Sequence, residues 1–416
     1  MLKPESPAEN LPVPNSLQES ESPLELADRP RLPLDVVACI MDQIDYQILN
    51  YDDLDVSAAC PLRHLKMGQF DRETLATLRL VSRSFNKLAR PLMYRSLSIQ
   101  RREATARPRV LEHVTMVASD EHLRHVTCLD LTPFITTSSA RHLSDIVLAL
   151  FVSRLPNLRV LEFRDVGELS DFPHLHSKLL GLKSLDGLTL AMGRDGHGVD
   201  LKGKQVTELV THFAPRLRSL AILDSVTMTY DSISSILASP SLRHLSMHNF
   251  ALRLGADDEA SSPNPALLTW SPALQSLHMS TSHRTAWPIC YLLIITNTKT
   301  LRSLSLAGPL LAAAFSGASL SLPNLVEVFC PPSNPTAASR LLASAALWDA
   351  PKLATLAIPH DSGVCLCLAV LLAEGGFPHL QTVRWTLGLD EEESEDCDPL
   401  KVLLKSRGIT LTWGTW

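Results

Sequence analysis

A six-residue pattern of apolar and polar positions, L-x-x-L-x-L, returns repeatedly between residues 126 and 385. The regular copies are PNLRVLEF (156–163), PRLRSLAI (215–222), PSLRHLSM (240–247), PALQSLHM (272–279), KTLRSLSL (299–306), PKLATLAI (351–358) and PHLQTVRW (378–385). Less regular copies are VTCLDL (126–131), LDGLTL (185–190) and PNLVEVFC (323–330). Since apolar residues alternate with polar ones in each copy, they share one face of a predicted short β-strand.

The spacing of the copies predicts a repeat protein. Their first apolar residues are 126, 158, 185, 217, 242, 274, 301, 325, 353 and 380, on average about 28 residues apart. Stretches with helical spacing lie between copies, for example 231–240 and 338–351. A single strand and helix cannot bury their apolar faces, whereas stacked copies can. We therefore predict an α/β fold, a curved leucine-rich-repeat solenoid with one parallel sheet and helices outside, closed by a capping strand in RGITLTW (407–413).

Two amphipathic helices are predicted before the repeats. In the first, 32–44, Pro33 suits the first helical position, and apolar residues recur every four positions. The second, 71–91, has an apolar face and is expected to end at Pro91. So few short helices make a small core, which favours packing against a partner.

The two helical segments resemble an F-box. The opening pattern L-P-x-[ED]-V-x-x-x-I-x-x-x-[LI] is matched by Leu32, Pro33, Asp35, Val36, Ile40 and Ile44. The later L-V-[SC]-[RK]-x-[FW] pattern is matched by Leu80, Val81, Ser82, Arg83 and Phe85. The resemblance covers 29–97 in two blocks, separated by an insertion at 45–70 that departs from the family. Degenerate repeats after such a module resemble those of fungal-type F-box proteins with leucine-rich repeats.

The resemblance implies a non-catalytic substrate receptor of a Skp–cullin–F-box ubiquitin ligase. Its F-box would bind a Skp-type adaptor, and through it a cullin, while the repeats bind a protein substrate. The expected adaptor-binding residues are Leu32, Pro33, Val36, Ile40, Ile44, Leu75, Leu78, Val81 and Phe85. One alternative is a scaffold, outside ubiquitination, whose first helices merely cap the solenoid. Another is a hydrolase or transferase with an unfamiliar site.

These patterns divide the chain into three parts. Residues 1–28 are a proline-rich acidic leader with six acids and one lysine, a composition typical of disorder. Residues 29–97 form the F-box-like helical domain, and residues 98–416 form the solenoid. An acidic run at 390–398 is expected to be a loop, and it lacks the glycine of a calcium-binding loop.

The repeat register also predicts which side chains face the concave side. Residues at the third, fifth and seventh places of a copy point away from the leucines. The candidate substrate-binding residues are Glu162, Arg164, His244, His248, His278 and Arg384. The histidines suggest a groove that titrates near neutral pH. The alternative is a weakly constrained strand surface whose small residues ease curvature.

Charge adds little to this interpretation. The net charge of the 416-residue chain is −6, and the leader carries most of it, so the folded part is nearly neutral. Residues 71–110 hold ten basic and three acidic residues, which suits an acidic adaptor but is also typical of a solvated face. Because no aromatic residues interleave with these arginines, we expect no nucleic-acid binding.

The remaining residue types argue against other functions. Eight scattered cysteines favour reduced, buried thiols in a cytoplasmic or nuclear protein, and Cys365 and Cys367 have no second pair at zinc spacing. The runs 289–295 and 364–373 are too short to span a membrane, so we expect buried helices there. No signal peptide, P-loop or hydrolase motif is found. We therefore expect no cofactor, metal or membrane partner.

Overall fold

A computed structural model describes residues 77, 80–81, 83–99, 120–131, 138–164, 169, 172–191, 204–223, 227–248, 251–253, 273–280, 287–307, 320–330, 335–344, 347, 350–386 and 397–414. The leader, the helix predicted at 32–44, the insertion at 45–70 and most of the acidic run lie outside these residues. The structure therefore does not test those predictions.

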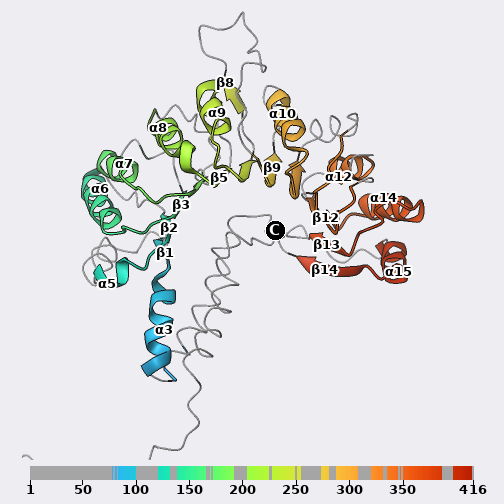
Figure 1. Cartoon of the computed structure of the whole chain (residues 1–416), viewed down its shortest axis with the longest axis horizontal. Helices are drawn as coiled ribbons and strands as arrows, with labels where there is room; N and C mark the ends of the chain where they lie inside the picture. Colours follow the sequence, from blue (N-terminus) through green and yellow to red (C-terminus); the bar gives the residue numbers. More distant parts are fainter. Residues whose placement is uncertain are drawn as a thin grey trace, which may run out of the picture.

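Twelve parallel strands form one curved sheet, in which strand order follows chain order (Figure 1). They are β1 (Ser96–Ile99), β2 (Cys128–Leu131), β3 (Val160–Arg164), β4 (Gly187–Ala191), β5 (Ser219–Leu223), β7 (His244–His248), β9 (Ser276–Ser280), β10 (Ser303–Ala307), β11 (Glu327–Phe329), β12 (Thr355–Pro359), β13 (Thr382–Thr386) and β14 (Thr410–Gly414). A separate two-stranded parallel sheet consists of β6 (Thr227–Thr229) and β8 (Ala251–Arg253).

Helices cover the convex side of the sheet (Figure 1). They are α5 (Asp120–Leu123), α6 (Ser138–Ser153), α7 (Pro173–Leu180), α8 (Lys204–Phe213) with the 3₁₀ turn η2 (Ala214–Arg216), α9 (Tyr230–Leu237), α10 (Trp287–Asn297), α12 (Pro335–Leu342), α14 (Ser362–Ala373) and α15 (Asp398–Ser406). A further helix, α3 (Arg83–Tyr94), leads into β1 at the N-terminal end of the arc (Figure 1).

The protein is thus a leucine-rich-repeat solenoid, as the sequence predicts. Each of the ten predicted copies forms a strand of the large sheet that begins two residues after its first apolar residue. In β7, for example, Leu245 and Met247 are 1% exposed and belong to one continuous core that also contains Leu242. Alternation along the strand puts these core residues on the helix side of the sheet.

The structure departs from the prediction at three places. The strand β1 was not predicted, and the expected domain boundary at residue 97 falls inside it. Helix α3 continues through Pro91 to Tyr94, whereas Pro91 was expected to end the helix. Proline lacks the N–H that would bond the carbonyl four residues earlier, which is why a helix end is expected there. The sheet of β6 and β8 was also not predicted.

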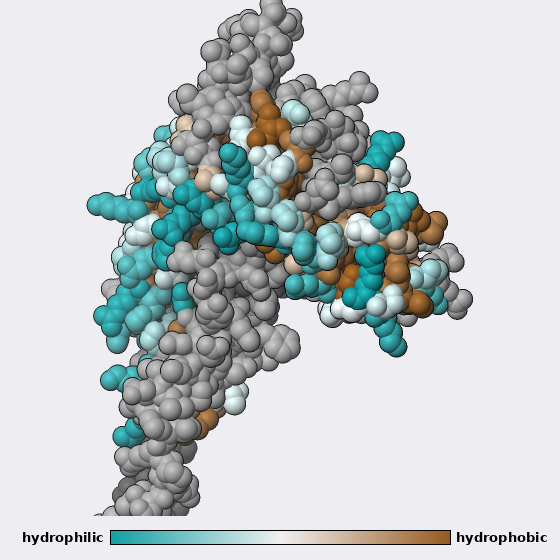
Figure 2. All heavy atoms as spheres, turned by 45° about the vertical axis from the view of Figure 1, so that its right-hand side comes forward, coloured by the Kyte–Doolittle hydropathy of each residue, from teal (hydrophilic) through white to brown (hydrophobic). Residues whose placement is uncertain are grey.

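The two apolar runs form α10 and α14, as predicted, but α14 is not fully buried. Its outer face exposes Leu366 and Val370, and Val402 on α15 is 70% exposed. Figure 2 shows apolar atoms at the surface of this C-terminal part of the molecule. Among the described residues, no helix has the length and apolar character required to cross a membrane.

Candidate functional site

Parallel pairing aligns the concave side chains in rows across the sheet. The central row runs through Ser98, Asp130, Glu162, Thr189, Ala221, Ser246, His278, Ser305, Phe329, Ala357, Arg384 and Thr412. Two acids thus lie toward the N-terminal end of the row and an arginine toward the C-terminal end, and between them lie small residues, one histidine and Phe329. The acidic and basic members of the row thus lie at opposite ends of the solenoid.

A histidine cluster occupies the middle of the concave face. The Nε2 atom of His278 lies 2.7 Å from Ser276 Oγ, and that of His248 lies 3.1 Å from Ser246 Oγ. These contacts between residues two positions apart agree with the predicted strand register. His244 and His248 are half-buried, while His278 is 5% exposed.

The burial of His278 corrects the expectation that the three histidines titrate together near neutral pH. Burial, followed by the nearby His248 and His244, lowers the pKa of His278 from 6.5 to about 3. A neutral imidazole can donate one hydrogen bond and accept another, so His278 contributes polarity but no charge at neutral pH.

The other predicted substrate-binding residues differ in accessibility. Glu162 is fully buried, which makes it inaccessible as a substrate contact in this structure, whereas Arg384 is half-buried. Arg164 is on β3, paired with Ala191 on β4. Phe329, which was not among the predicted site residues, has its ring centroid 6.1 Å from that of His278 on the same face. Phe329 is at the fifth place of the irregular copy 323–330, a place that the repeat register puts on the concave side.

Of the predicted adaptor-binding residues, the structure describes two. Val81 is 63% exposed just before α3, and Phe85 is half-buried on that helix. Leu80, which belongs to the same F-box-like pattern, is 83% exposed. The remaining ones, Leu32, Pro33, Val36, Ile40, Ile44, Leu75 and Leu78, lie outside the described residues.

None of the described cysteines forms a disulfide, and all but Cys367, which is half-buried, are buried. Burial raises the pKa of Cys128 to about 11 and those of Cys290 and Cys330 to about 12. These thiols are therefore protonated at neutral pH and are poor nucleophiles. No three histidine, cysteine or acidic side chains come together to hold a metal ion within the described ranges.

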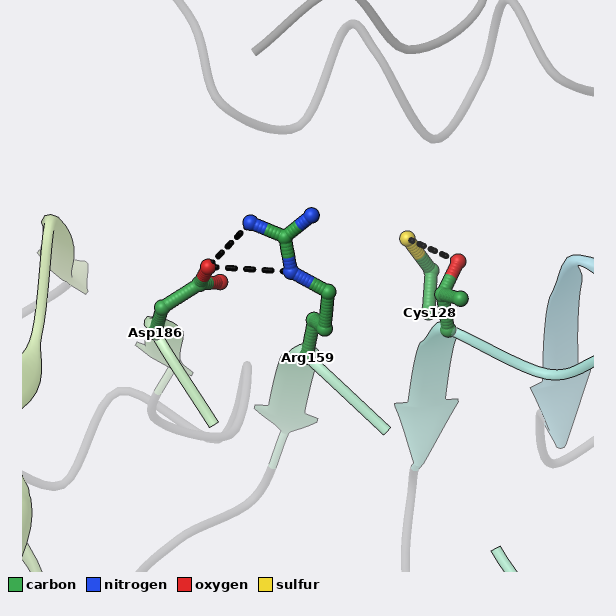
Figure 3. Close-up of polar contacts among 4 residues, drawn as sticks. Cys128, Arg159 and Asp186 are labelled. Carbon is green, nitrogen blue, oxygen red and sulfur yellow. Dashed lines mark hydrogen bonds and ion pairs between the residues drawn. The ribbon is translucent and has the colours of Figure 1, made fainter. Parts of the chain in front are cut away.

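A second set of polar residues, not predicted from the sequence, lies at the edge of the sheet. The residue before each strand lies at the N-terminal edge of the sheet, and in several repeats it is arginine. Figure 3 shows Arg159 and Asp186 there, at the starts of β3 and β4. Arg159 Nε donates to Asp186 Oδ2 at 3.0 Å, and its Nη2 bonds the same oxygen. The arginine that follows the first leucine in several copies is the sequence feature that could have indicated these residues.

Comparisons with known proteins do not assign the chain to a family. No protein-family model matches it. No curated protein matches it. Among solved structures, it is similar to a chain of the yeast Rad7 and Elc1 complex, with 15% sequence identity and a TM-score of 0.31, over 88% of this chain and 98% of that one.

Proposed function

We propose that this protein is the substrate-recognition subunit of a Skp–cullin–F-box ubiquitin ligase. In this proposal the F-box-like segment binds a Skp-type adaptor and the solenoid binds the protein to be modified. The chain itself does no chemistry. It raises the effective concentration of the substrate beside a separate conjugating enzyme.

The observation that carries the proposal is the connection of α3 to the solenoid. A single residue, Arg95, separates the end of α3 from β1, and β1 is the first strand of the large sheet. The carbonyl of Arg95 also accepts hydrogen bonds from Thr127 N and Cys128 N, at 2.8 and 3.0 Å. An adaptor bound at the F-box-like segment would thus be held at a fixed orientation to the concave face.

The exposed apolar residues beside α3 support a partner there. Leu80 and Val81 belong to the F-box-like pattern and expose 83% and 63% of their surface. Burying such side chains in an interface contributes about 1.5–3 kcal/mol each. The expected adaptor contacts at Val81 and Phe85 rest on the resemblance, together with this exposure.

The test is a pull-down of a Skp-type adaptor with matched variants. Val81→Asp puts a charge into the proposed interface and should abolish adaptor binding, because burying an unpaired charge costs several kcal/mol. The control, Leu366→Asp on α14, replaces a residue that is also 63% exposed and should leave binding intact. If the parent chain fails to capture the adaptor, or if Val81→Asp still binds it, the scaffold alternative is favoured.

The substrate-binding part of the proposal needs its own variant. His244→Glu with His248→Glu changes two half-buried residues of the concave face. Proteins captured through the solenoid should change, while adaptor binding persists. If the parent and the variant capture the same proteins, the substrate binds at a place other than the histidine cluster.

A further inference from the structure

Two cysteines from neighbouring repeats meet between the last two helices of the solenoid. We propose that Cys365 and Cys397 are an oxidation site, where hydrogen peroxide joins the two thiols in a disulfide that links α14 to α15. This site lies outside the proposed function and does not depend on it. The proposal rests on the contact between the two sulfurs, on their position at one edge of the sheet and on the charges beside them.

The two thiols are in direct contact, although they are 32 residues apart in the sequence. Cys365 is in the first turn of α14, and Cys397 is the residue that precedes α15. Cys397 Sγ donates a hydrogen bond to Cys365 Sγ at 2.6 Å. Because a disulfide bond is about 2.05 Å long, the sulfurs need only a small further approach to become bonded.

A second cysteine of α14 lacks this contact and serves as a comparison. Cys367 Sγ donates to the carbonyl of Ser339, on α12, at 3.7 Å. Side chains two positions apart on a helix point to different sides, so Cys365 and Cys367 approach different neighbouring helices. The contact with α15 is therefore specific to Cys365.

The position of α15 gives a small oxidant access to the pair. In the folded chain Cys365 is 1% exposed and Cys397 is 0% exposed. Helix α15 packs against α14, and β14, which follows it, is an edge strand of the large sheet (Figure 1). A repeat at the edge has one neighbouring repeat instead of two, so it opens locally more readily than an inner repeat. We assign the reaction to molecules in which α15 has separated from α14.

The surroundings of Cys365 set the order of the two steps. Burial, followed by the hydrogen bond with Cys397, raises the pKa of Cys365 above its usual value of 9.0. Cys365 is therefore held as the thiol, whereas the thiolate is the nucleophile in such reactions. Cys397 leaves the interface when α15 separates, so the first attack on the peroxide is assigned to Cys397.

The reaction balances with hydrogen peroxide as the only oxidant. The Cys397 thiolate attacks one peroxide oxygen, so an S–O bond forms, the O–O bond breaks, and the departing hydroxide takes up a proton. The sulfur is oxidised to a sulfenic acid, and the peroxide is reduced by two electrons. The Cys365 sulfur then attacks the sulfenic sulfur, so the S–S bond forms and the S–O bond breaks. The second hydroxide leaves as water with the proton of Cys365.

The charges beside Cys397 favour an uncharged oxidant. Residues 390–398 contain seven acids and no basic residue. One of these acids, Asp398, pairs with Lys401 at 3.0 Å. Hydrogen peroxide is neutral, so the acidic run does not repel it, whereas the run repels an anionic oxidant such as oxidised glutathione.

Peptide mapping of the full-length chain after treatment with hydrogen peroxide tests the proposal. Unreacted thiols are alkylated, the chain is digested without reductant, and cross-linked peptides are identified by mass spectrometry. We expect a disulfide between Cys365 and Cys397 that disappears after reduction with dithiothreitol. Cys365→Ser should abolish the cross-link to Cys397, and the matched control Cys367→Ser should retain it.

Hydrogen exchange provides a second measurement. Since the disulfide ties α15 to α14, amide exchange in residues 398–406 should slow by at least about tenfold on oxidation of the parent chain. The same treatment of Cys365→Ser should leave exchange in this helix unchanged.

Several results would overturn the proposal. They are the absence of this cross-link in the oxidised parent, a cross-link between Cys330 and Cys367 in its place, and unchanged exchange in α15 after oxidation. Faster cross-linking by oxidised glutathione than by hydrogen peroxide at equal concentration would overturn the choice of oxidant. If Cys365→Ser unfolds at a lower temperature than the reduced parent, Cys397→Ala replaces it and should leave Cys365 without a cross-link.

Discussion

Asp145, a buried residue of α6, caps the first turn of α7 through His174. Its Oδ2 accepts hydrogen bonds from the backbone N of His174 at 3.0 Å and contacts His174 Nδ1 at 2.7 Å. Its Oδ1 accepts from the backbone N of Leu175 at 2.7 Å. Phe172, the residue that precedes α7, makes no side-chain cap. A carboxylate from the previous repeat thus satisfies the amides that a local cap would otherwise bind.

This cap predicts a large effect of a single substitution. Asp145→Ala should lower the free energy of unfolding by about 2–4 kcal/mol, because it leaves the buried Leu175 amide without an acceptor. Asp145→Asn keeps one acceptor and should cost less. Urea unfolding at neutral pH measures both. The control is Asp398→Ala, where an exposed acid pairs with Lys401 at 3.0 Å and should matter by less than about 1 kcal/mol. Equal effects of Asp145→Ala and the control would contradict the cap.

His278 predicts how stability depends on pH. Its pKa is about 3 in the folded chain and 6.5 without the protein environment, so below pH 6.5 the unfolded chain takes up a proton that the folded chain does not. The contribution of the neutral His278 to the free energy of unfolding is therefore fully present above pH 6.5, and it is lost as the pH falls toward 3. At pH 5 the loss should be about 2 kcal/mol.

Removing the imidazole should remove this part of the pH dependence. In His278→Gln, the difference in unfolding free energy between pH 7.5 and pH 5 should be smaller than in the parent by about the same 2 kcal/mol. Glutamine can still bond Ser276 Oγ. Identical pH profiles for the two proteins would argue against a buried, neutral histidine at this position.

The side chain of Asn297 satisfies a second backbone amide, that of Leu274. Asn297, at the end of α10, is 2% exposed and accepts a hydrogen bond from the backbone N of Leu274 at 2.9 Å. Its Nδ2 donates to the Leu293 carbonyl at 2.9 Å. Asn297→Ala should lower the unfolding free energy by about 1–3 kcal/mol. The comparison is Asn324→Ala, which removes bonds to the Lys299 carbonyl and from Lys352 Nζ at an exposed site and should cost less.

The end of α14 depends on two adjacent glycines. Gly375 has a φ of +92°, and a Cβ on Gly376 would lie 2.9 Å from the carbonyl oxygen of Leu371. That oxygen also accepts the hydrogen bond from Gly376 N, so it cannot move without breaking the helix end. We expect Gly376→Ala to lower the thermal unfolding midpoint more than Gly181→Ala, where the nearest backbone oxygen is 3.2 Å away and φ is −74°. An equal shift would show that the helix end adjusts.

Local periodicity predicted the strands because each repeat must bury apolar residues at the same positions. Leu242, Leu245 and Met247 had to share a face, and the structure places all three in the core. The strand β1 was missed because its short sequence, SLSI, follows a helix and not a proline-led repeat. The helix end was wrongly predicted at Pro91 because local rules favour an end there, whereas α3 continues to Tyr94.

The candidate site was harder to predict than the fold. Alternation along β9 indicates the face on which His278 lies, but a pattern in one strand contains no information about what packs over that face. The burial of His278 and Glu162 therefore could not be read from periodicity. The row formed by the residues before the strands requires the alignment of different repeats, which emerges only when each strand pairs with the next.

The chain-order arrangement of strands has a mechanical consequence. Each inner strand of the large sheet pairs with the strands of the preceding and following repeats, and the strands run in parallel from one end of the arc to the other. Tension applied between the two ends of the solenoid would therefore load its repeats in series. The arc can stretch elastically by small rotations between repeats before any one of them ruptures. A terminal repeat that peels away would release about 28 residues, or about 90 Å of extended chain, and leave the next repeat as the new end.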